Sequence, residues 1–313
     1  WETYFGMSVF RKEEMFMDIE IMGEIRRKRP LIHCITNYVT ANDVANIILA
    51  AGGCAVMADG EREVEDIVSI SQGLVINMGT LKEGTIPAMI KAGKRANELG
   101  IPVVFDPVGA GASRFRTEAC KRVFEQIKVS LARGNASEIK ALAKALEENG
   151  RPQAPTPEAG RTKGVDVSEK DRLTEENLQK NIIFAEDFAK RHGIMCLMTG
   201  NTDIATDGDR TFLAENGTPM MAGITGAGCM LDGLAALFLA AQGHGGDVFT
   251  AALAAAAEGY CGQRAEERIR EQRRLFPAYP AGTGSFRTFL IDGISCLTDE
   301  ELKEGMKIEA WKR

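Results

Sequence analysis

The chain has 313 residues, 44% of them hydrophobic and 26% charged, with a formal net charge of -6 at pH 7. This composition is typical of a globular protein, and the length suits one large domain better than two complete ones. The acidic balance argues against nucleic acid or an anionic membrane as the main partner, and no stretch reaches the ~18 uninterrupted apolar residues of a membrane span. An anionic substrate remains compatible, because backbone N–H groups can build a local anion site.

The N-terminal segment and the cysteines bear on where the chain works. Residues 1–17 are interpreted as an N-terminal extension without a signal-peptide core, in which "WETYFG" is a remnant of expression and Met7 and Met15 are two candidate natural starts. Seven scattered cysteines, an odd number with no CxxC pair, predict a reducing cytoplasm. Five are predicted to pack in the core: Cys34, Cys54, Cys120, Cys196 and Cys296.

Short apolar runs that end in small or polar residues alternate with helix-like stretches, and together they predict one domain over residues 18–305. The runs show no polar alternation, which suits strands buried on both faces of a parallel sheet. This rhythm predicts a three-layer α/β/α fold, with a mostly parallel central sheet and helices on both faces. The predicted strands lie in 54–60, 73–80, 101–111, 128–135 and 194–201. The predicted helices are 40–51, 61–72, 84–99, 114–126, 137–148 and 175–192.

Two later segments break the alternation. Residues 150–171 are rich in Pro, Gly, Lys and Glu and are predicted to be a surface insertion. Residues 202–219 contain the turn signals "DGDR" and "ENGT" between short runs, which predicts an antiparallel hairpin. Nearly everything after the hairpin is predicted to be helical, over 226–242, 247–271 and 285–297.

Polar or glycine residues follow five of the predicted strands. In an open parallel sheet, ligands bind beyond the carboxyl ends of the strands. A single Asn, Asp or Gly at such a position is more often a helix cap or a turn residue, but five together predict a ligand site. The residues are Met57 with Asp59, Asn77 with Gly79, Asp106 with Gly109, Arg133 with Asn135, and Thr199 with Gly200.

Two of these strand ends allow a metal and a phosphate. In "FDPVGAG", Asp106 either caps the following turn or supplies an oxygen to Mg²⁺. In "ARGNASEIKAL", Asn135 and Glu138 have the spacing of a capping box. Arg133 at the same strand end offers a cation for phosphate, and Glu138 offers oxygens for a hydrated metal. The capping and the ligand interpretations are compatible.

The stretch "ITGAGCMLDGLAALFLAA" places a glycine-rich turn directly before an apolar helix. The N–H groups of Gly226, Ala227, Gly228 and Cys229 are predicted to form an anion hole, which the helix dipole strengthens. A cysteine at a helix N-terminus is expected to have a lowered thiol pKa and to be reactive. The alternative is a plain helix start with a packed cysteine.

Several common enzyme motifs are missing from the sequence. There is no GxxxxGK[ST] P-loop and no GxSxG nucleophile elbow, and "GAGAS" lacks the third glycine of a dinucleotide fingerprint. The three histidines are unclustered, which argues against zinc.

The motifs together resemble the hydroxyethylthiazole kinase family of the ribokinase-like superfamily. The similarity runs in order over roughly residues 18–300, and "CITNYVTANDVAN" with "ARGNASEI" separates this family from sugar and pyrimidine kinases. Further matching stretches are "AVMADGEREVEDI", "LVINMGTL", "IPVVFDPVGAGASRFR", "MTGNTDIATDG", "ITGAGCMLDGLAALFLA" and "GSFRTFLIDGI". One departure lies in the turn, where Ala227 replaces the usual threonine but leaves the backbone N–H groups intact.

The resemblance implies ATP-dependent phosphorylation of the hydroxyl of 4-methyl-5-(2-hydroxyethyl)thiazole in thiamine salvage, with Mg²⁺. It also implies a homotrimer with thiazole sites between subunits, and no nucleic-acid or membrane partner. By position, Cys229 takes the place of the catalytic base. The other implied roles are thiazole contacts for Met57, Gly226 and Asn37, ATP contacts for Arg133 and Thr199, and metal-side positions for Asp106 and Glu138.

Two alternatives to this function stay open. One is another small-alcohol kinase of the same superfamily, such as a hydroxymethylpyrimidine kinase. The other is a catalytically silent relative that binds thiazole or nucleotide, although the presence of Asp106, Arg133, Glu138 and Cys229 argues against it.

Overall fold

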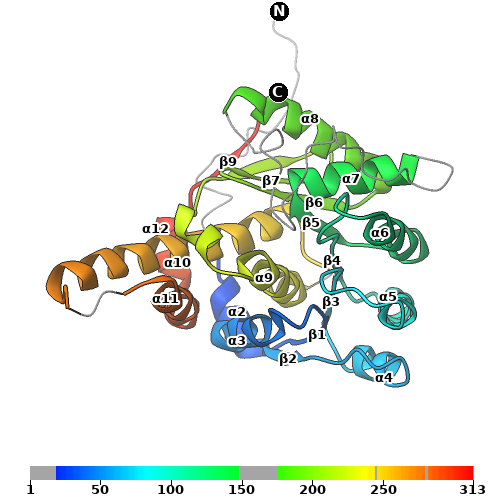
Figure 1. The fold of residues 1–313 in the computed structure, drawn as a ribbon, viewed down its shortest axis with the longest axis horizontal. Helices are drawn as coiled ribbons and strands as arrows, with labels where there is room; N and C mark the ends of the chain where they lie inside the picture. The colour runs from blue at the N-terminus through cyan, green and yellow to red at the C-terminus, as the bar shows by residue number, and fades with distance from the viewer. Residues whose placement is uncertain (1–18, 148–174, 244, 279–280, 313) are drawn as a thin grey trace, which may run out of the picture.

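A nine-stranded sheet forms the centre of the molecule (Figure 1). The computed structural model describes residues 19–147, 175–243, 245–278 and 281–312. The predicted extension over 1–17 and the predicted insertion over 150–171 lie outside these residues.

Six strands are parallel and three are antiparallel, in the order β2-β1-β3-β4-β5-β6-β7-β8-β9. The parallel strands are β1 (Leu31–Ile35), β2 (Cys54–Val56), β3 (Gly73–Asn77), β4 (Val103–Asp106), β5 (Leu131–Asn135) and β6 (Met195–Thr199). The antiparallel strands are β7 (Asp203–Thr206), β8 (Thr211–Ala214) and β9 (Ile308–Ala310). The predicted hairpin is therefore confirmed as β7 and β8, and β9 extends it by one strand.

Helices cover both faces of the sheet, which confirms the predicted three layers (Figure 1). One face carries α4 (Val64–Ser69), α5 (Thr85–Leu99), α6 (Arg114–Gln126), α7 (Ala136–Glu147) and α8 (Glu175–His192). The other face carries α2 (Ile21–Lys28), α3 (Ala41–Ala51), the 3₁₀ helix η2 (Pro219–Gly223), α9 (Ala227–Gln242), α10 (Val248–Leu275), α11 (Thr283–Cys296) and α12 (Asp299–Gly305).

Neighbouring side chains of the central strands pack into two separate hydrophobic cores. In β3, Val75 packs into the core beneath α9, whereas Leu74 and Ile76 pack into the core beneath α5. This alternation follows from the pleat, which points successive side chains to opposite faces. Both faces are apolar, so the strand carries the unbroken hydrophobic run on which the prediction of a parallel sheet depended.

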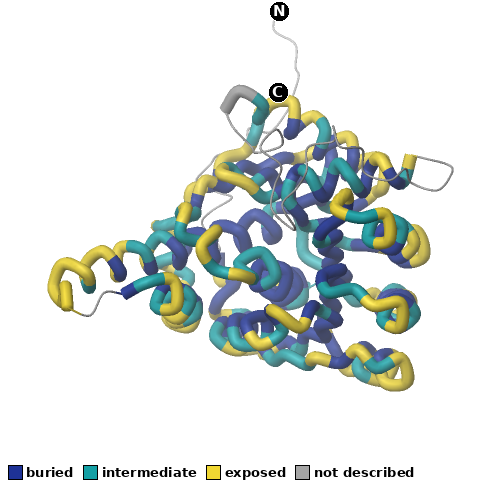
Figure 2. The backbone as a smooth tube through the Cα atoms, viewed as in Figure 1, coloured by how far each residue is buried: buried dark blue, intermediate teal, exposed yellow. Residues whose placement is uncertain are grey.

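Helix α9 lies deep in the molecule, and Figure 2 shows burial along most of its length, whereas the outer end of α10 is exposed. Among the described residues, no helix is both long and apolar enough to cross a membrane. All seven cysteines are free thiols. Of the five predicted core residues, Cys34, Cys120 and Cys196 are buried and Cys54 is half-buried, but the prediction for Cys296 is wrong. It is the last residue of α11 and is exposed there, because its apolar sequence neighbours turn inward while it faces solvent.

Candidate active site

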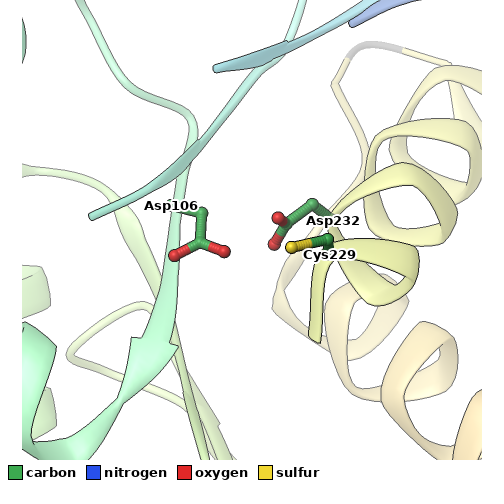
Figure 3. Close-up of side chains that lie close together, drawn as sticks. All are labelled: Asp106, Cys229 and Asp232. Carbon is green, nitrogen blue, oxygen red and sulfur yellow. The ribbon is translucent and has the colours of Figure 1, made fainter. Parts of the chain in front are cut away.

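Polar side chains from several strands meet the start of α9 at the carboxyl edge of the sheet. Asn77 ends β3 and Asp106 ends β4, and the two residues are paired in register. Helix α9 packs across β3 and β4, so its first turns lie over these strand ends. The fold thus brings Cys229 and Asp232, from that helix, to Asp106 (Figure 3).

The side chain of Asn77 links the members of this group. Its Nδ2 lies 3.0 Å from Oδ2 of Asp106, 2.9 Å from Oδ2 of Asp232 and 3.4 Å from Sγ of Cys229. Both aspartates are fully buried, and Oδ1 of each has no hydrogen-bond partner. Buried carboxylate oxygens normally have hydrogen-bond partners, so two that lack them at one place are consistent with a ligand site. One ligand atom from each of Asp106, Cys229 and Asp232 lies within 4.8 Å of the others.

Arg133 reaches this group from β5. It also contacts Thr199, so the two predicted ATP-binding residues lie together. Its Nη1 donates to Oδ2 of Asp106 at 3.2 Å, and its Nη2 donates to Oγ1 of Thr199 at 3.2 Å. Its Nε lies 3.8 Å from Oδ1 of Asp232. A Cβ atom on Gly228 would lie only 2.5 Å from either Nη atom, so this turn position has to be glycine while Arg133 keeps its place.

Burial controls the protonation of the acidic groups. It raises the pKa of Asp106 well above its ordinary value, and the charge of Asp232 raises it further against the opposing effect of Arg133. Burial also raises the pKa of Asp232 to about 6, and here again Arg133 acts in the opposite direction.

The thiol of Cys229 differs from expectation. Burial raises its pKa to about 12, and the charges of Asp232 and Asp106 raise it further. The prediction of a lowered thiol pKa at the start of a helix is therefore wrong. The helix dipole is the weaker influence where the thiol is buried beside two carboxylates.

Glu138 is occupied by backbone groups. Its Oε1 accepts the N–H of Gly109 at 2.9 Å, and its Oε2 accepts the N–H of Asn135 at 3.0 Å. Oδ1 of Asn135 accepts the N–H of Glu138 at 3.0 Å in return, which confirms the capping box. Burial, and after it the charge of Asp106, raises the pKa of Glu138 to about 7. Glu138 thus fixes the loop after β4, and its role as a metal ligand stays a prediction.

The glycine turn begins α9 as expected. Gly226 is the N-cap with φ 90°, and a Cβ there would lie 2.7 Å from Cγ2 of Thr40. The first N–H groups of any helix lack intrahelical acceptors, which is compatible with an anion hole over residues 226–229, and that anion hole stays a prediction. Asn37, a predicted substrate contact, lies at the same place, with Nδ2 3.2 Å from Sγ of Cys229 and 3.1 Å from Oδ1 of Asn77.

Met57 follows β2 at the same edge and is 38% exposed. The buried ring of His33 holds the segment that contains Met57. Nε2–H of His33 donates to the carbonyl of Ala58, the residue after Met57, at 2.7 Å.

Asp232 was missing from the predicted site. The signal was present, because Asp232 is the only charged residue in the apolar stretch 229–241 and lies one helical turn after Cys229. The position of Asn77 at a strand end predicts no specific role for it, and in the structure its side chain contacts both aspartates and the cysteine.

Comparisons with known proteins identify the family of this chain. Residues 22–300 match the hydroxyethylthiazole kinase family. A hydroxyethylthiazole kinase of Clostridium beijerinckii is 44% identical over 290 residues, which cover 92% of this chain and 95% of that enzyme. The solved structure of hydroxyethylthiazole kinase from Pyrococcus horikoshii superposes with a TM-score of 0.76 at 30% identity, covering 94% of this chain and 98% of its own.

A more distant structure bears on the fold alone. A ribokinase-like superfamily protein of Enterococcus faecalis has a TM-score of 0.52 at 11% identity, over 84% of this chain and 86% of its own. With the closer relatives, it identifies the three-layer architecture as a ribokinase-like fold.

Proposed function

Since this chain belongs to the hydroxyethylthiazole kinase family, we propose that it transfers the γ-phosphoryl group of ATP to the hydroxyl of 4-methyl-5-(2-hydroxyethyl)thiazole, releasing ADP. The observation that carries the proposal is the half-buried Arg133, which lies between Asp106 and Thr199 and against the first turn of α9. A guanidinium at the start of a helix suits the transfer of a phosphoryl group, whose charge needs positioning and electrostatic stabilisation rather than covalent help.

ATP and the alcohol approach from different sides in this proposal. Arg133 and Thr199 bind the phosphates of ATP, and the N–H groups of residues 226–229 hold the transferring group. Gly226, Asn37 and Met57 contact the thiazole alcohol. The contact of Asn37 with the Cys229 thiol, at 3.2 Å, supports the placement of the acceptor hydroxyl there. Holding the two reactants in line is the main source of rate.

Cys229 is proposed as the catalytic residue nearest the acceptor hydroxyl. Because its pKa is raised to about 12, the thiol is neutral at pH 7 and is a poor acceptor for the alcohol proton. Its contribution is then to orient the hydroxyl toward the phosphoryl group.

Mg²⁺ fits the oxygen-rich part of the site. It prefers oxygen ligands and disfavours thiolate, so Asp106 and Asp232 would hold it rather than Cys229 (Figure 3). Each of the two aspartates has a buried Oδ1 without a hydrogen bond. The ion would supply positive charge against the phosphates. Glu138 supports this site through the loop it fixes, and is retained as a proposed metal-side residue.

We further propose a homotrimer with the thiazole sites between subunits. Three large apolar side chains near the acceptor end of the site support it, because Tyr38, Val39 and Met57 are 54%, 62% and 38% exposed. The free thiols support a cytoplasmic location.

Two assays test the function. ATP consumption by the purified chain should depend on added thiazole alcohol, and a preference for hydroxymethylpyrimidine would assign a different acceptor. ATP consumption without dependence on either alcohol would contradict a small-alcohol kinase.

The role of Cys229 is tested by substitution. Cys229→Ala should lower kcat about tenfold at saturating substrates, since one oriented contact to the reacting hydroxyl is lost. Cys196→Ala is the matched control, because Cys196 is a buried thiol within β6. Undiminished turnover by Cys229→Ala would remove this residue from the catalytic role.

A further inference from the structure

Thr80 adopts a backbone conformation that β-branched residues avoid. Its φ is +40°, and Arg29 at +48° is the only other non-glycine residue with positive φ in the described part of the chain. Arg29 has an ordinary reason, since it is the left-handed C-cap of α2. Thr80 ends no helix and lies three residues beyond β3, at the edge that carries the candidate active site. Such strain persists where surrounding contacts require it.

One contact requires the hydroxyl of Thr80 in this position. Oγ1 of Thr80 accepts the backbone N–H of Tyr38 at 3.2 Å. The preceding residue, Asn37, donates to Oδ1 of Asn77 at 3.1 Å. Residues 77–80 therefore hold residues 37–38 through two hydrogen bonds. Asn77 accepts one from Asn37, and Thr80 accepts the other from Tyr38.

The two segments are also packed closely. A Cβ on Gly79 would lie 2.8 Å from Cβ of Asn37, so residues 79 and 37 are in direct contact. Nζ of Lys82 lies 4.5 Å from the centre of the Tyr38 ring, which adds a cation–π contact between the same two loops. The position of Asn37 beside Sγ of Cys229 thus depends on the loop after β3.

We propose that Thr80 is a positioning residue for the acceptor alcohol. Its hydroxyl, held in place by a strained backbone, fixes the Tyr38 N–H and so sets Asn37 against Cys229. This inference rests on the proposed function, because it takes the neighbourhood of Asn37 and Cys229 as the place where the acceptor hydroxyl binds.

Three substitutions separate the hydroxyl from the strain. Thr80→Val keeps the branched shape and the strain but removes the acceptor, Thr80→Ser keeps the acceptor, and Thr80→Gly removes both acceptor and strain. Arg29→Gly is the matched control, because it relieves a positive φ far from the site, at the end of α2.

The KM of the thiazole alcohol should depend on the hydroxyl of residue 80, and the melting temperature should depend on its backbone strain. Thr80→Val and Thr80→Gly should each raise the KM of the thiazole alcohol about five- to tenfold with the KM of ATP unchanged, whereas Thr80→Ser should stay within about twofold. Thr80→Gly should melt at least as high as Thr80→Val, since the strain is gone. Arg29→Gly should leave both KM values unchanged.

A second measurement does not depend on the substrate. Amide hydrogen exchange at Tyr38 should be about tenfold faster in Thr80→Val and Thr80→Gly and unchanged in Thr80→Ser, because the N–H loses its acceptor only in the first two. Wild-type exchange at Tyr38 together with a wild-type KM in Thr80→Val would overturn the proposal. So would a parallel rise of both KM values with a lower melting temperature, which is the pattern of general structural damage.

The outcome for the proposed function is separate. If the wild-type chain leaves the thiazole alcohol unphosphorylated, the proposed function fails. The exchange rates at Tyr38 then still decide whether the Thr80 hydroxyl fixes the segment that contains Asn37.

Discussion

Two acidic regions of the molecule treat their carboxylates in opposite ways. Where α2 meets α12, Oδ1 of Asp299 accepts the N–H of Met22 at 2.7 Å and Oδ2 accepts the N–H of Gly23 at 2.9 Å. In the candidate active site, Asp106 and Asp232 are fully buried and each has one oxygen without a hydrogen bond. At the helix N-terminus both carboxylate oxygens of Asp299 accept hydrogen bonds. In the second region one oxygen of each aspartate accepts none.

This difference distinguishes a carboxylate that stabilises the fold from the two carboxylates that are proposed to bind a ligand. A satisfied carboxylate at a helix start adds stability, whereas a buried unsatisfied one reduces it and is retained only where function needs it. The contrast predicts that substitutions in the candidate active site mainly change activity. Substitutions where α2 meets α12 should mainly change stability.

The largest effect is expected at Arg133, the only cation in contact with the two open aspartates in the described residues. Arg133→Met should lower kcat/KM for ATP about 1000-fold, because a charge-assisted contact with the transferring phosphoryl group is lost. Steady-state kinetics with varied ATP measure this. Arg133→Lys should retain an intermediate rate, since it keeps the charge without the planar fork. A loss below tenfold in Arg133→Met would contradict the ATP assignment.

The next effect concerns stability at Glu258, a buried residue of α10 whose Oε1 has no partner. Burial raises its pKa to about 8, with Arg133 opposing the rise and Asp203 adding to it. An unfolded carboxyl titrates near pH ~4.3, so the folded state binds the extra proton between about pH 4 and 8. Stability therefore falls as pH rises through that window.

Glu258→Gln removes this dependence. The variant should be more stable than the wild type at pH 8 by a few kcal/mol (on the order of 2–5), and the difference should disappear near pH 4. Chemical denaturation at both pH values measures it. An equal difference at the two pH values would mean that titration of Glu258 is not the cause.

The smallest effect is expected at the satisfied junction. Asp299→Ala should lower stability by about 1–2 kcal/mol, since two N–H groups at the start of α2 lose their acceptor. The melting temperature should fall by about 2–4 °C, while kcat and both KM values stay unchanged. A fall in kcat without a fall in melting temperature would break the proposed division between the two regions.

Much of the fold could be predicted because its signals are local. The buried runs of β3 to β6 and the turn residues of the β7–β8 hairpin are continuous in the sequence. Strand β1 was missed because its five residues include His33, and a histidine buried within a strand looks like an interruption until its Ala58 partner is known. The short β9 was missed because it depends on pairing with the distant β8.

The sequence predicted which strand-end residues gather, but not their protonation or their hydrogen bonding. The strand ends did gather Asn77, Asp106, Arg133 and Thr199, as the topology of a parallel sheet requires. The raised pKa of Cys229 and the unpartnered oxygen of Asp232 follow from burial and from contacts between distant segments. Neither property is visible in local sequence.

The contact between Gly228 and the guanidinium of Arg133 has an evolutionary consequence. Because a single methyl group at residue 228 would displace that guanidinium, we expect substitutions at the two positions to be coupled. We expect descendants that lose the arginine to be free to fill the glycine, and those that keep it to retain the bare backbone. In directed evolution toward another phosphoryl donor, these two codons are therefore best randomised together.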